Sequence, residues 1–591
     1  MSKSKIRNKD DINLIDKIIM FVLVGIVPIL VYYLDADVPA EQLAIVNIPT
    51  DYFNYIKVNV IIVMAVVILF FRCADIMERL GEFVVVDELK KAFKNPFFFF
   101  GFLIVVATVL SFIFSDYKAT ALHGAMERFE SIWVHFSYII IFSYAITFFK
   151  KNDAFKVFTY SILFSTFVVG LIGTVQFLGY QPLNSEFFKT LTHGNYEAVF
   201  NNSGSYSTMY NINTSASYSL FMLFVLVLIA IKDGRLPIKL VSLVNVVLLG
   251  ITLYNSKSEA SYIALVAALV FILILCIFTL FIRKKKKEGL ILLAVSLIVF
   301  FGSIVAITAI PTLNAQVSNK VASALGAESN FSDYEKIDNT FYFYKYNDDY
   351  IAITTYADYF EVYENENLLN SYEYETFTSE TIPTENFGDF LVAKEILDEY
   401  ENVFLSIDDA MFYIVAGEEP FLLDKYNLYE FEEAEHIGFE KHLKLFTDRG
   451  YIWSRSLPMA LDSILIGKGA DNFIMEFPNY DYLGRWYSDF PEGILVDKPH
   501  NIYFSMWINN GGIYLISFIG ICFLVLKDKI KLLINKENAN VQYAAVIVYL
   551  GAFAGYIVNG MSTDNIVVIT MLFWIFLGIG TKVFNKEVVE K

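Results

Sequence analysis

A polar stretch, 447–501, concentrates side chains that could carry out chemistry in an otherwise apolar chain of 591 residues. It closes on His500, which follows Pro499 and precedes Asn501. An imidazole has an ordinary pKa near 6.5 and can act as a general base close to neutral pH. His500 could instead cap a helix, and we keep both interpretations. We expect Asn501 to contact substrate beside it.

Arginines in the same stretch could bind an anionic group. Arg449 and Trp453 are four residues apart, so they share a face if the segment is helical. Apolar residues within 452–464 predict that this helix is amphipathic and lies on the membrane face. We expect Arg449 to be catalytic and Arg455 and Lys498 to bind substrate. The alternative for Arg449 is a surface ion pair, which contributes little.

A second candidate is the short turn 255–259, which separates two apolar stretches and contains Lys257. Such a turn leaves a lysine little room to be an ordinary surface charge. Lys257 either pairs with Glu259 or meets an anionic head group, and the sequence favours neither.

Two further groups have a simpler explanation beside the chemical one. Asn211 and Asn213 could hydrogen-bond sugar hydroxyls, but capping of the following helix is the favoured interpretation. Asp35 and Asp37 could bind a divalent cation, yet two acids beyond a helix end are commonplace. We therefore predict no metal site and no cofactor.

Composition places these residues in a membrane protein. The chain is 56% hydrophobic and only 18% charged, with a mean hydropathy of +0.50. These values exclude a typical soluble domain and a disordered chain. The net charge of −18 argues against a nucleic-acid partner. The three cysteines show no spacing typical of a disulfide framework or a zinc site.

Twelve apolar stretches are long enough to cross a bilayer as helices. They are 14–34, 56–72, 97–115, 131–149, 155–179, 215–231, 237–254, 260–282, 289–310, 502–526, 542–559 and 563–584. Basic residues precede the first stretch and follow every second one, as in Lys284–Lys287. Because cytoplasmic loops carry the excess of Lys and Arg, we predict cytoplasmic termini and an extracytoplasmic 447–501.

One water-facing module interrupts the apolar chain. Residues 311–450 carry 30 Asp and Glu against 8 Lys and Arg. Alternating apolar and polar residues in 341–364 predict a β-meander, while 391–416 predicts a helix. We favour a solvated accessory role over direct substrate contact.

The predicted fold is an all-α polytopic membrane protein with about 12 transmembrane helices and a small extracytoplasmic α+β insert between helices 9 and 10. Its segments are transmembrane helices 1–9 (1–310), the acidic insert (311–446), the catalytic loop (447–501) and helices 10–12 (502–591).

Taken in order, these stretches resemble the O-antigen ligase family and the related polysaccharide polymerases. That family has Asn-Pro-Asn before a span, Ser-Arg between two spans, and a long external loop. The loop carries an Arg shortly before a Trp, a Gly-x-Gly turn followed by Asn-Phe, and a closing Pro-His-Asn. The counterparts here are Tyr210–Asn213, Ser256–Lys257, Arg449 with Trp453, Gly467–Gly469 with Asn472–Phe473, and Pro499–Asn501. The resemblance covers 200–584 without the acidic insert, and the earlier spans match only in hydropathy.

The resemblance implies transfer of a glycan from an undecaprenyl-diphosphate carrier to a glycan, lipid or protein acceptor. The reaction would be metal-independent and would take place on the outer face of the bacterial plasma membrane. Arg449 would bind the diphosphate, and His500 would orient or deprotonate the acceptor hydroxyl. Two positions depart from the family: Lys257 replaces an Arg, so a point charge replaces a bidentate fork, and Ile212 replaces a Pro.

Three alternatives remain open at this point. A polymerase would differ from a ligase only in its acceptor. A flippase for lipid-linked sugars would also suit many spans, but the two halves show no similarity and no matching pair of interrupted helices. A sensor would need a cytoplasmic output domain, and every predicted internal loop is short.

Overall fold

The computed structural model describes most of the chain, in two compact units. The described residues are 11–35, 39–43, 50–51, 53–79, 93–193, 204–209, 211–284, 287, 290–291, 293–294, 297–298, 333–344, 349–384, 389–397, 400–407, 410–415, 420–423, 434–439, 442–443, 445–481, 484–485, 495–535 and 540–582. The helical unit comprises Met1–Phe301, Ser463–Met475 and His500–Lys591, and the sheet unit comprises Gly302–Asp462 and Glu476–Pro499. The predicted loop 447–501 is therefore divided between the two units.

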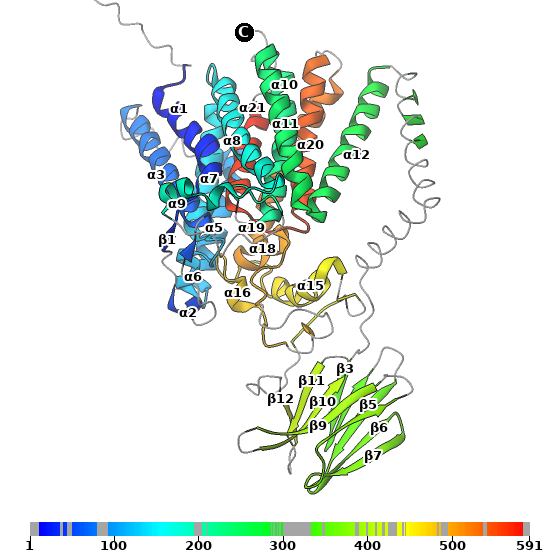
Figure 1. Ribbon diagram of the computed structural model, residues 1–591. Helices are drawn as coiled ribbons and strands as arrows, with labels where there is room; N and C mark the ends of the chain where they lie inside the picture. The colour runs from blue at the N-terminus through cyan, green and yellow to red at the C-terminus, as the bar shows by residue number, and fades with distance from the viewer. Residues whose placement is uncertain are drawn as a thin grey trace, which may run out of the picture. The chain divides into compact units, whose positions relative to one another are not determined.

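The helical unit is a bundle of apolar helices (Figure 1). Its longer helices are α3 (Asn54–Arg79), α5 (Pro96–Phe114), α7 (Ile132–Phe148), α8 (Ala154–Phe177), α10 (Ile212–Asp233), α11 (Leu236–Ser256), α12 (Glu259–Ile282), α19 (Gly512–Ile534), α20 (Asn540–Asn559) and α21 (Val567–Lys582). Shorter elements are α1 (Leu14–Phe21), α2 (Ala40–Leu43), α6 (Lys118–His123), α9 (Glu186–Thr192), the 3-10 helix η3 (Pro182–Asn184), α18 (Ile502–Asn510) and the paired strands β1 (Leu34–Asp35) and β2 (Thr50–Asp51). Helix α16 (Phe473–Glu476) is a single turn.

Seven of the described helices are long and apolar enough to cross a membrane. They are Asn54–Ala74, Pro96–Phe114, Ala154–Phe177, Ile212–Asp233, Leu236–Ser256, Glu259–Ile282 and Gln542–Asn559, and Ile132–Phe148 and Val567–Thr581 are shorter apolar helices. The hydrocarbon core of a membrane offers no hydrogen-bond partners, and a helix pairs its backbone N–H and C=O groups internally. The chain is therefore consistent with a membrane-embedded protein. The count of twelve stays a prediction, and the predicted span 289–310 lies largely outside the described residues.

Two predicted spans are interrupted. The first continues from α1 through a π-helix, η1 (Val22–Ile26), and a 3-10 helix, η2 (Val27–Ile29), where Pro28 removes a backbone donor. The predicted span 502–526 breaks at Gly511, between α18 and α19, where φ is +89°. A Cβ there would meet the Leu465 carbonyl oxygen at 2.4 Å, so the turn requires glycine.

Helices α7, α10, α20 and α21 contribute to one apolar core. Trp574 is fully buried there, and Tyr556 stacks on Phe573 with ring centroids 3.7 Å apart. By contrast, α12 leaves large apolar side chains such as Ile263 and Val266 exposed. An apolar exposed surface suits a lipid environment rather than water.

The described connections gather at two ends of the bundle. Contacts at one end join helix ends and connections predicted to be cytoplasmic: Lys151 pairs with Asp16, Arg72 donates to Thr147, and Arg283 lies over the Tyr543 ring. Contacts at the other end join connections predicted to be external: Asn54 with Glu127, Asn255 with Ser205, and Asn501 with Met561. The candidate functional residues of this unit, His500 and Lys257, lie in these connections predicted to be external.

The sheet unit holds two five-stranded antiparallel sheets. One follows the order β3 (Asp333–Ile337), β4 (Thr340–Tyr344), β5 (Tyr350–Thr355), β6 (Tyr359–Glu364) and β7 (Asn367–Glu373), as the predicted meander requires. The other contains β8 (Ser379–Pro383), β9 (Asp389–Leu397), β10 (Tyr400–Ile407), β11 (Ala410–Val415) and β12 (Phe421–Leu423).

The prediction of a helix over 391–416 is wrong. This segment forms β9, β10 and β11, paired in register from Tyr400↔Leu397 and from Ile407↔Ala410. Only two residues separate each pair of strands, the length of a tight hairpin, and β11 is rich in β-branched and aromatic residues. The described part of the acidic insert up to Leu423 is therefore β rather than α+β.

Helix α15 (Leu445–Asp462) confirms the predicted helix in the polar stretch. Pro458 lies inside it and has no N–H to donate to the Ser454 carbonyl four residues earlier. That carbonyl instead accepts a hydrogen bond of 2.9 Å from the backbone N–H of Ile437. The proline therefore frees an acceptor that anchors the preceding segment to the helix.

Candidate functional site

His500 occupies the turn that leads into α18, with its backbone in the left-handed region at φ +48°. Its Nδ1 lies 3.0 Å from Oδ2 of Asp564, and the two side chains are 31% and 20% exposed. A carboxylate on one ring nitrogen orients the imidazole and, when Nδ1 carries the proton, leaves Nε2 as a base. Nε2 makes no hydrogen bond to the described part of the chain.

The turn around His500 is fixed by its neighbours. Asn501 caps α18, because its Oδ1 accepts from the backbone N–H groups of Tyr503 (2.9 Å) and Phe504 (3.2 Å). Its Nδ2 donates to the carbonyl of Met561 at 3.1 Å. We predicted substrate contact for Asn501, and the structure gives its side chain these structural partners. They tie His500 to the connection that carries Asp564.

A recess adjoins the pair on the Asp564 side. Its empty space, including the part open to solvent, is about 330 Å³. The lining comes from α10, α20, α21, the connection between the last two helices, and Ile502 at the start of α18. Its polar members are Ser217, Asn559, Thr563, Asp564 and Thr570. The recess can therefore present hydroxyl, amide and carboxylate groups to a ligand within an apolar surround.

A chain of polar side chains leads from this recess to the predicted lysine turn. Asn559 Nδ2 donates to Ser217 Oγ at 2.7 Å, and Asn559 Oδ1 accepts from Ser261 Oγ at 3.2 Å. Ser261 Oγ accepts in turn from Ser258 Oγ at 3.3 Å. Because Ser258 follows Lys257 directly, the turn and the recess belong to one polar region.

Lys257 ends α11 in the left-handed conformation, at φ +54°, and its side chain is exposed. It forms no ion pair with any described residue, Glu259 included, so the alternative of a local pair is not supported. An exposed ammonium next to the polar chain can receive an anion.

The predicted pair of amides has a capping role at Asn211. Its Oδ1 accepts from the backbone N–H of Thr214 at 2.9 Å and from the Thr214 hydroxyl at 3.0 Å. Asn213 is exposed, and its carbonyl accepts from Ser217 Oγ at 2.9 Å. The favoured capping interpretation is therefore confirmed for Asn211, while Asn213 lies one turn from the recess wall.

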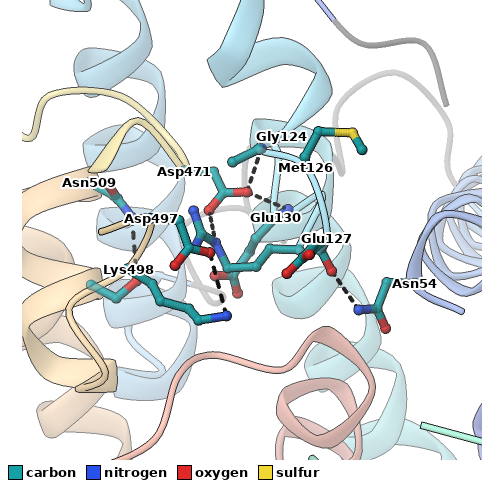
Figure 2. A network of polar contacts seen from close by, with 12 residues as sticks. Asn54, Gly124, Met126, Glu127, Glu130, Asp471, Asp497, Lys498 and Asn509 are labelled. Atoms are coloured by element: carbon teal, nitrogen blue, oxygen red, sulfur yellow. Dashed lines mark hydrogen bonds and ion pairs between the residues drawn. The ribbon is translucent and has the colours of Figure 1, made fainter. Parts of the chain in front are cut away.

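Asp471 organises the connection between α5 and α7 (Figure 2). Its Oδ2 accepts from the backbone N–H groups of Ala125 (2.6 Å) and Glu130 (3.1 Å), and its Oδ1 accepts from Arg128 Nε at 2.7 Å. Arg128 and Asp471 are both buried. A buried pair of this kind fixes geometry, since loss of one partner leaves an uncompensated charge.

The Gly-x-Gly turn just before Asp471 is a packing element. Lys468 N donates to the Ile508 carbonyl at 2.8 Å, and Gly469 N donates to the Asn509 carbonyl at 2.9 Å. A Cβ on Gly467 would meet that Asn509 oxygen at 2.3 Å. Asn472 Nδ2 donates to Ser115 Oγ at 2.7 Å, so the motif joins α18 to the end of α5.

Glu130 is a buried carboxyl within the same network. Its Oε1 accepts from Tyr138 OH at 3.0 Å, and it hydrogen-bonds with Asn565, the residue after Asp564. Burial, followed by the nearby Asp471 carboxylate, raises the pKa of Glu130 to about 8, while its hydrogen bonds and Arg128 oppose the shift. Glu130 is therefore mostly protonated at neutral pH and touches the connection that carries the His500 partner.

In the sheet unit, Arg449 and Trp453 lie on α15 as predicted. Trp453 Nε1 donates to the Pro499 carbonyl at 2.9 Å. Arg455 is 2% exposed, and its Nε lies 2.6 Å from Oδ2 of the fully buried Asp481. Its guanidinium also lies 5.1 Å from the Tyr451 ring centre. Arg455 thus has internal partners in place of the predicted substrate.

The remaining predicted residues are less informative. Lys498 Nζ lies 3.4 Å from Oδ2 of its neighbour Asp497, a partly exposed pair. Asp35 belongs to strand β1, and Asp37 lies outside the described residues. The described residues contain no group of three or more His, Cys, Asp or Glu side chains that could hold a metal ion.

Sequence reasoning did not single out Asp564, Asn559 or Glu130. The signal for Asp564 was the polar run 562–565, which we placed at the start of the predicted span 563–584; α21 begins only at Val567. Polar groups at membrane depth are costly and mark functional positions, so this run was informative.

The chain shows no significant match to a protein-family model, a curated protein or a solved structure.

Proposed function

We propose that this chain is a membrane glycosyltransferase, which moves a glycan from a polyprenyl-diphosphate carrier to a hydroxyl acceptor, as O-antigen ligases do. One observation carries the proposal: His500, a predicted base, is hydrogen-bonded to Asp564, and Asp564 lines a recess that contains further polar groups. The apolar helices suit a donor that is itself a lipid. A bacterial plasma membrane, cytoplasmic termini and an external site complete the proposal.

The acceptor hydroxyl gives its proton to Nε2 of His500, and its oxygen attacks the anomeric carbon. The bond between that carbon and the phosphate oxygen breaks, and the diphosphate leaves with the electron pair. Attack from the side opposite the diphosphate inverts the anomeric centre. Asp564 stabilises the imidazolium that forms. General-base assistance of this kind contributes roughly 100- to 10,000-fold.

The leaving diphosphate needs cations where negative charge accumulates. Lys257 is exposed, forms no ion pair with the described residues and adjoins the polar chain from the recess. We assign it to the diphosphate. The resemblance assigns Arg449 to the same group, and that role stays a prediction. Glycan, lipid and protein hydroxyls all fit the reaction, and a growing glycan as acceptor would make the enzyme a polymerase.

The test is transfer of a labelled glycan from undecaprenyl diphosphate by the purified full-length protein. His500→Ala and Asp564→Asn should each lose transfer by about 100-fold or more. His193→Ala is the matched control, because His193 is also exposed and left-handed, at φ +54°, but contacts the Tyr32 ring instead. It should keep wild-type transfer.

Two results would contradict the proposal. Full transfer by both His500→Ala and Asp564→Asn would show that His500 is not the general base. Movement of the labelled glycolipid across vesicles, without covalent transfer, would identify a flippase instead.

A further inference from the structure

The two faces of the sheet β3–β7 differ: one packs into the core of the unit, and the other carries a group of tyrosines. In β4, Phe341 and Phe343 are buried, and the alternate residues Tyr342 and Tyr344 are partly exposed on the opposite side. Register pairs Tyr344 with Tyr350 of β5, which puts them on the same face. The three tyrosine rings form a cluster, with centroids 5.4 to 6.1 Å apart.

The cluster continues across the sheet onto β6. Ala352 pairs with Tyr342 on one side and with Tyr363 on the other, so these residues form one row. Ala352 is only 3% exposed. Tyr359, at the start of β6, lies on the same face as Tyr363. Its ring stacks on that of Tyr356, with centroids 4.4 Å apart. Contiguous, partly exposed aromatic surface of this kind marks an interaction site more often than single exposed apolar residues do.

Carboxylates are interleaved with these rings. Tyr344 OH donates to Glu335 at 3.2 Å, and both Tyr363 OH (2.5 Å) and Tyr356 OH (3.3 Å) donate to Glu361. The hydrogen bond to Glu361 and partial burial raise the pKa of Tyr363 to about 12. The phenols therefore stay protonated and hold the carboxylates in place as hydrogen-bond acceptors.

A ligand for this face needs flat apolar surface for the rings and hydrogen-bond donors at its edges for the carboxylates. A sugar ring has both, since its C–H groups form an apolar face and its hydroxyls surround it. Tyrosine supplies rigid contact area at low entropic cost. The net charge of −22 over 311–450 repels anionic polymers. The chemistry therefore selects an uncharged glycan.

We propose that the tyrosine face formed by Tyr342, Tyr344, Tyr350, Tyr359 and Tyr363 binds an uncharged glycan chain. This inference deepens the proposed function, because the glycan would be part of the donor or the acceptor, and it adds a binding role for the acidic insert. Binding does not depend on transfer, so the two proposals can fail separately.

The test measures binding of uncharged hexasaccharides of glucose and of N-acetylglucosamine to the purified full-length protein by calorimetry. At least one should bind saturably. The double variant Tyr342→Ala/Tyr350→Ala should weaken that binding roughly tenfold or more, because two stacking rings are lost. Tyr342→Phe/Tyr350→Phe keeps the rings and should stay within about threefold of wild type.

Tyr480→Ala is the matched control, since Tyr480 is an exposed tyrosine of the sheet unit that belongs to neither sheet. It should bind as wild type, and so should His500→Ala, even where transfer is lost. Absence of binding to both hexasaccharides would overturn the inference. So would equal binding by the double alanine variant, or binding of polylysine with no binding of either sugar.

Discussion

Replacement of Glu130 by glutamine should remove a pH dependence from the stability of the helical unit. Glutamine has nearly the same shape as a protonated carboxyl and keeps an acceptor for Tyr138 OH. It cannot ionise. The wild-type carboxyl has to give up its proton at high pH while buried beside Asp471. The variant should therefore match wild type in acid and exceed it in alkali.

The magnitude follows from the two pKa values of Glu130. Its ordinary value is 4.5, and in the folded chain it is about 8. Because the folded state binds this proton more tightly, its stabilising contribution is fully present below pH 4.5 and is lost as pH rises through 8. Each unit of difference corresponds to about 1.4 kcal/mol. The free energy of unfolding of wild type relative to the variant should thus fall by as much as about 5 kcal/mol over this range.

The assay is unfolding of both proteins in detergent between pH 4.5 and 9. Glu186→Gln is the control, because Glu186 on α9 is 90% exposed and its ion pair among the described residues is with Lys189, three residues along the helix. That variant should follow the wild-type curve in parallel. Parallel curves for Glu130→Gln and wild type would refute the argument that the buried carboxyl holds a proton at neutral pH.

Three further outcomes are expected. Lys257→Ala should lower the rate of glycan transfer about 100- to 1,000-fold, the usual cost of losing one fixed donor to developing charge, while Lys257→Arg should retain transfer; equal rates for the alanine variant would remove Lys257 from the site. Gly467→Ala should destabilise the helical unit by about 1–3 kcal/mol, because its Cβ would overlap the Asn509 carbonyl oxygen; an unchanged melting temperature would show that the turn can shift. Alkaline phosphatase fused within 320–440 should be active and a fusion near 285 inactive, and the opposite pattern would reverse the predicted orientation.

The sequence predicted most of the helices well, because a long apolar run has few alternatives in hydrocarbon. It failed where a single residue decides the backbone. Gly511 follows Asn509 and Asn510 within a run that we predict to be one span, and its +89° φ and the nearby Leu465 carbonyl explain the break. In the sheet unit, 391–416 forms strands where we predict a helix, and charged residues such as Lys394 and Glu395 interrupt the alternation expected of a strand.

Side-chain partners were harder to predict than positions. Residue type and position in the chain are enough to predict His500 and Lys257 as candidates, and both lie in the polar region of the helical unit. Asp564, the partner of His500, is 64 residues away, and no local pattern links them. Arg455 shows the converse, since a charged residue beside Arg449 proves to be buried against Asp481.

Within the helical unit, the Gly-x-Gly turn and the His500–Asn501 pair are connected by residues outside either motif. Asp471 holds the backbone of Glu130, whose carboxyl meets Asn565, next to Asp564 and so to His500. Apart from the peptide bond between Asp564 and Asn565, each link is a hydrogen bond to a buried or partly buried group, which is costly to leave unpaired. The position of His500 therefore depends on the connection between α5 and α7 as well as on its own turn. A substitution at Asp471 should therefore shift the position of the His500 imidazole, although Asp471 does not contact that ring.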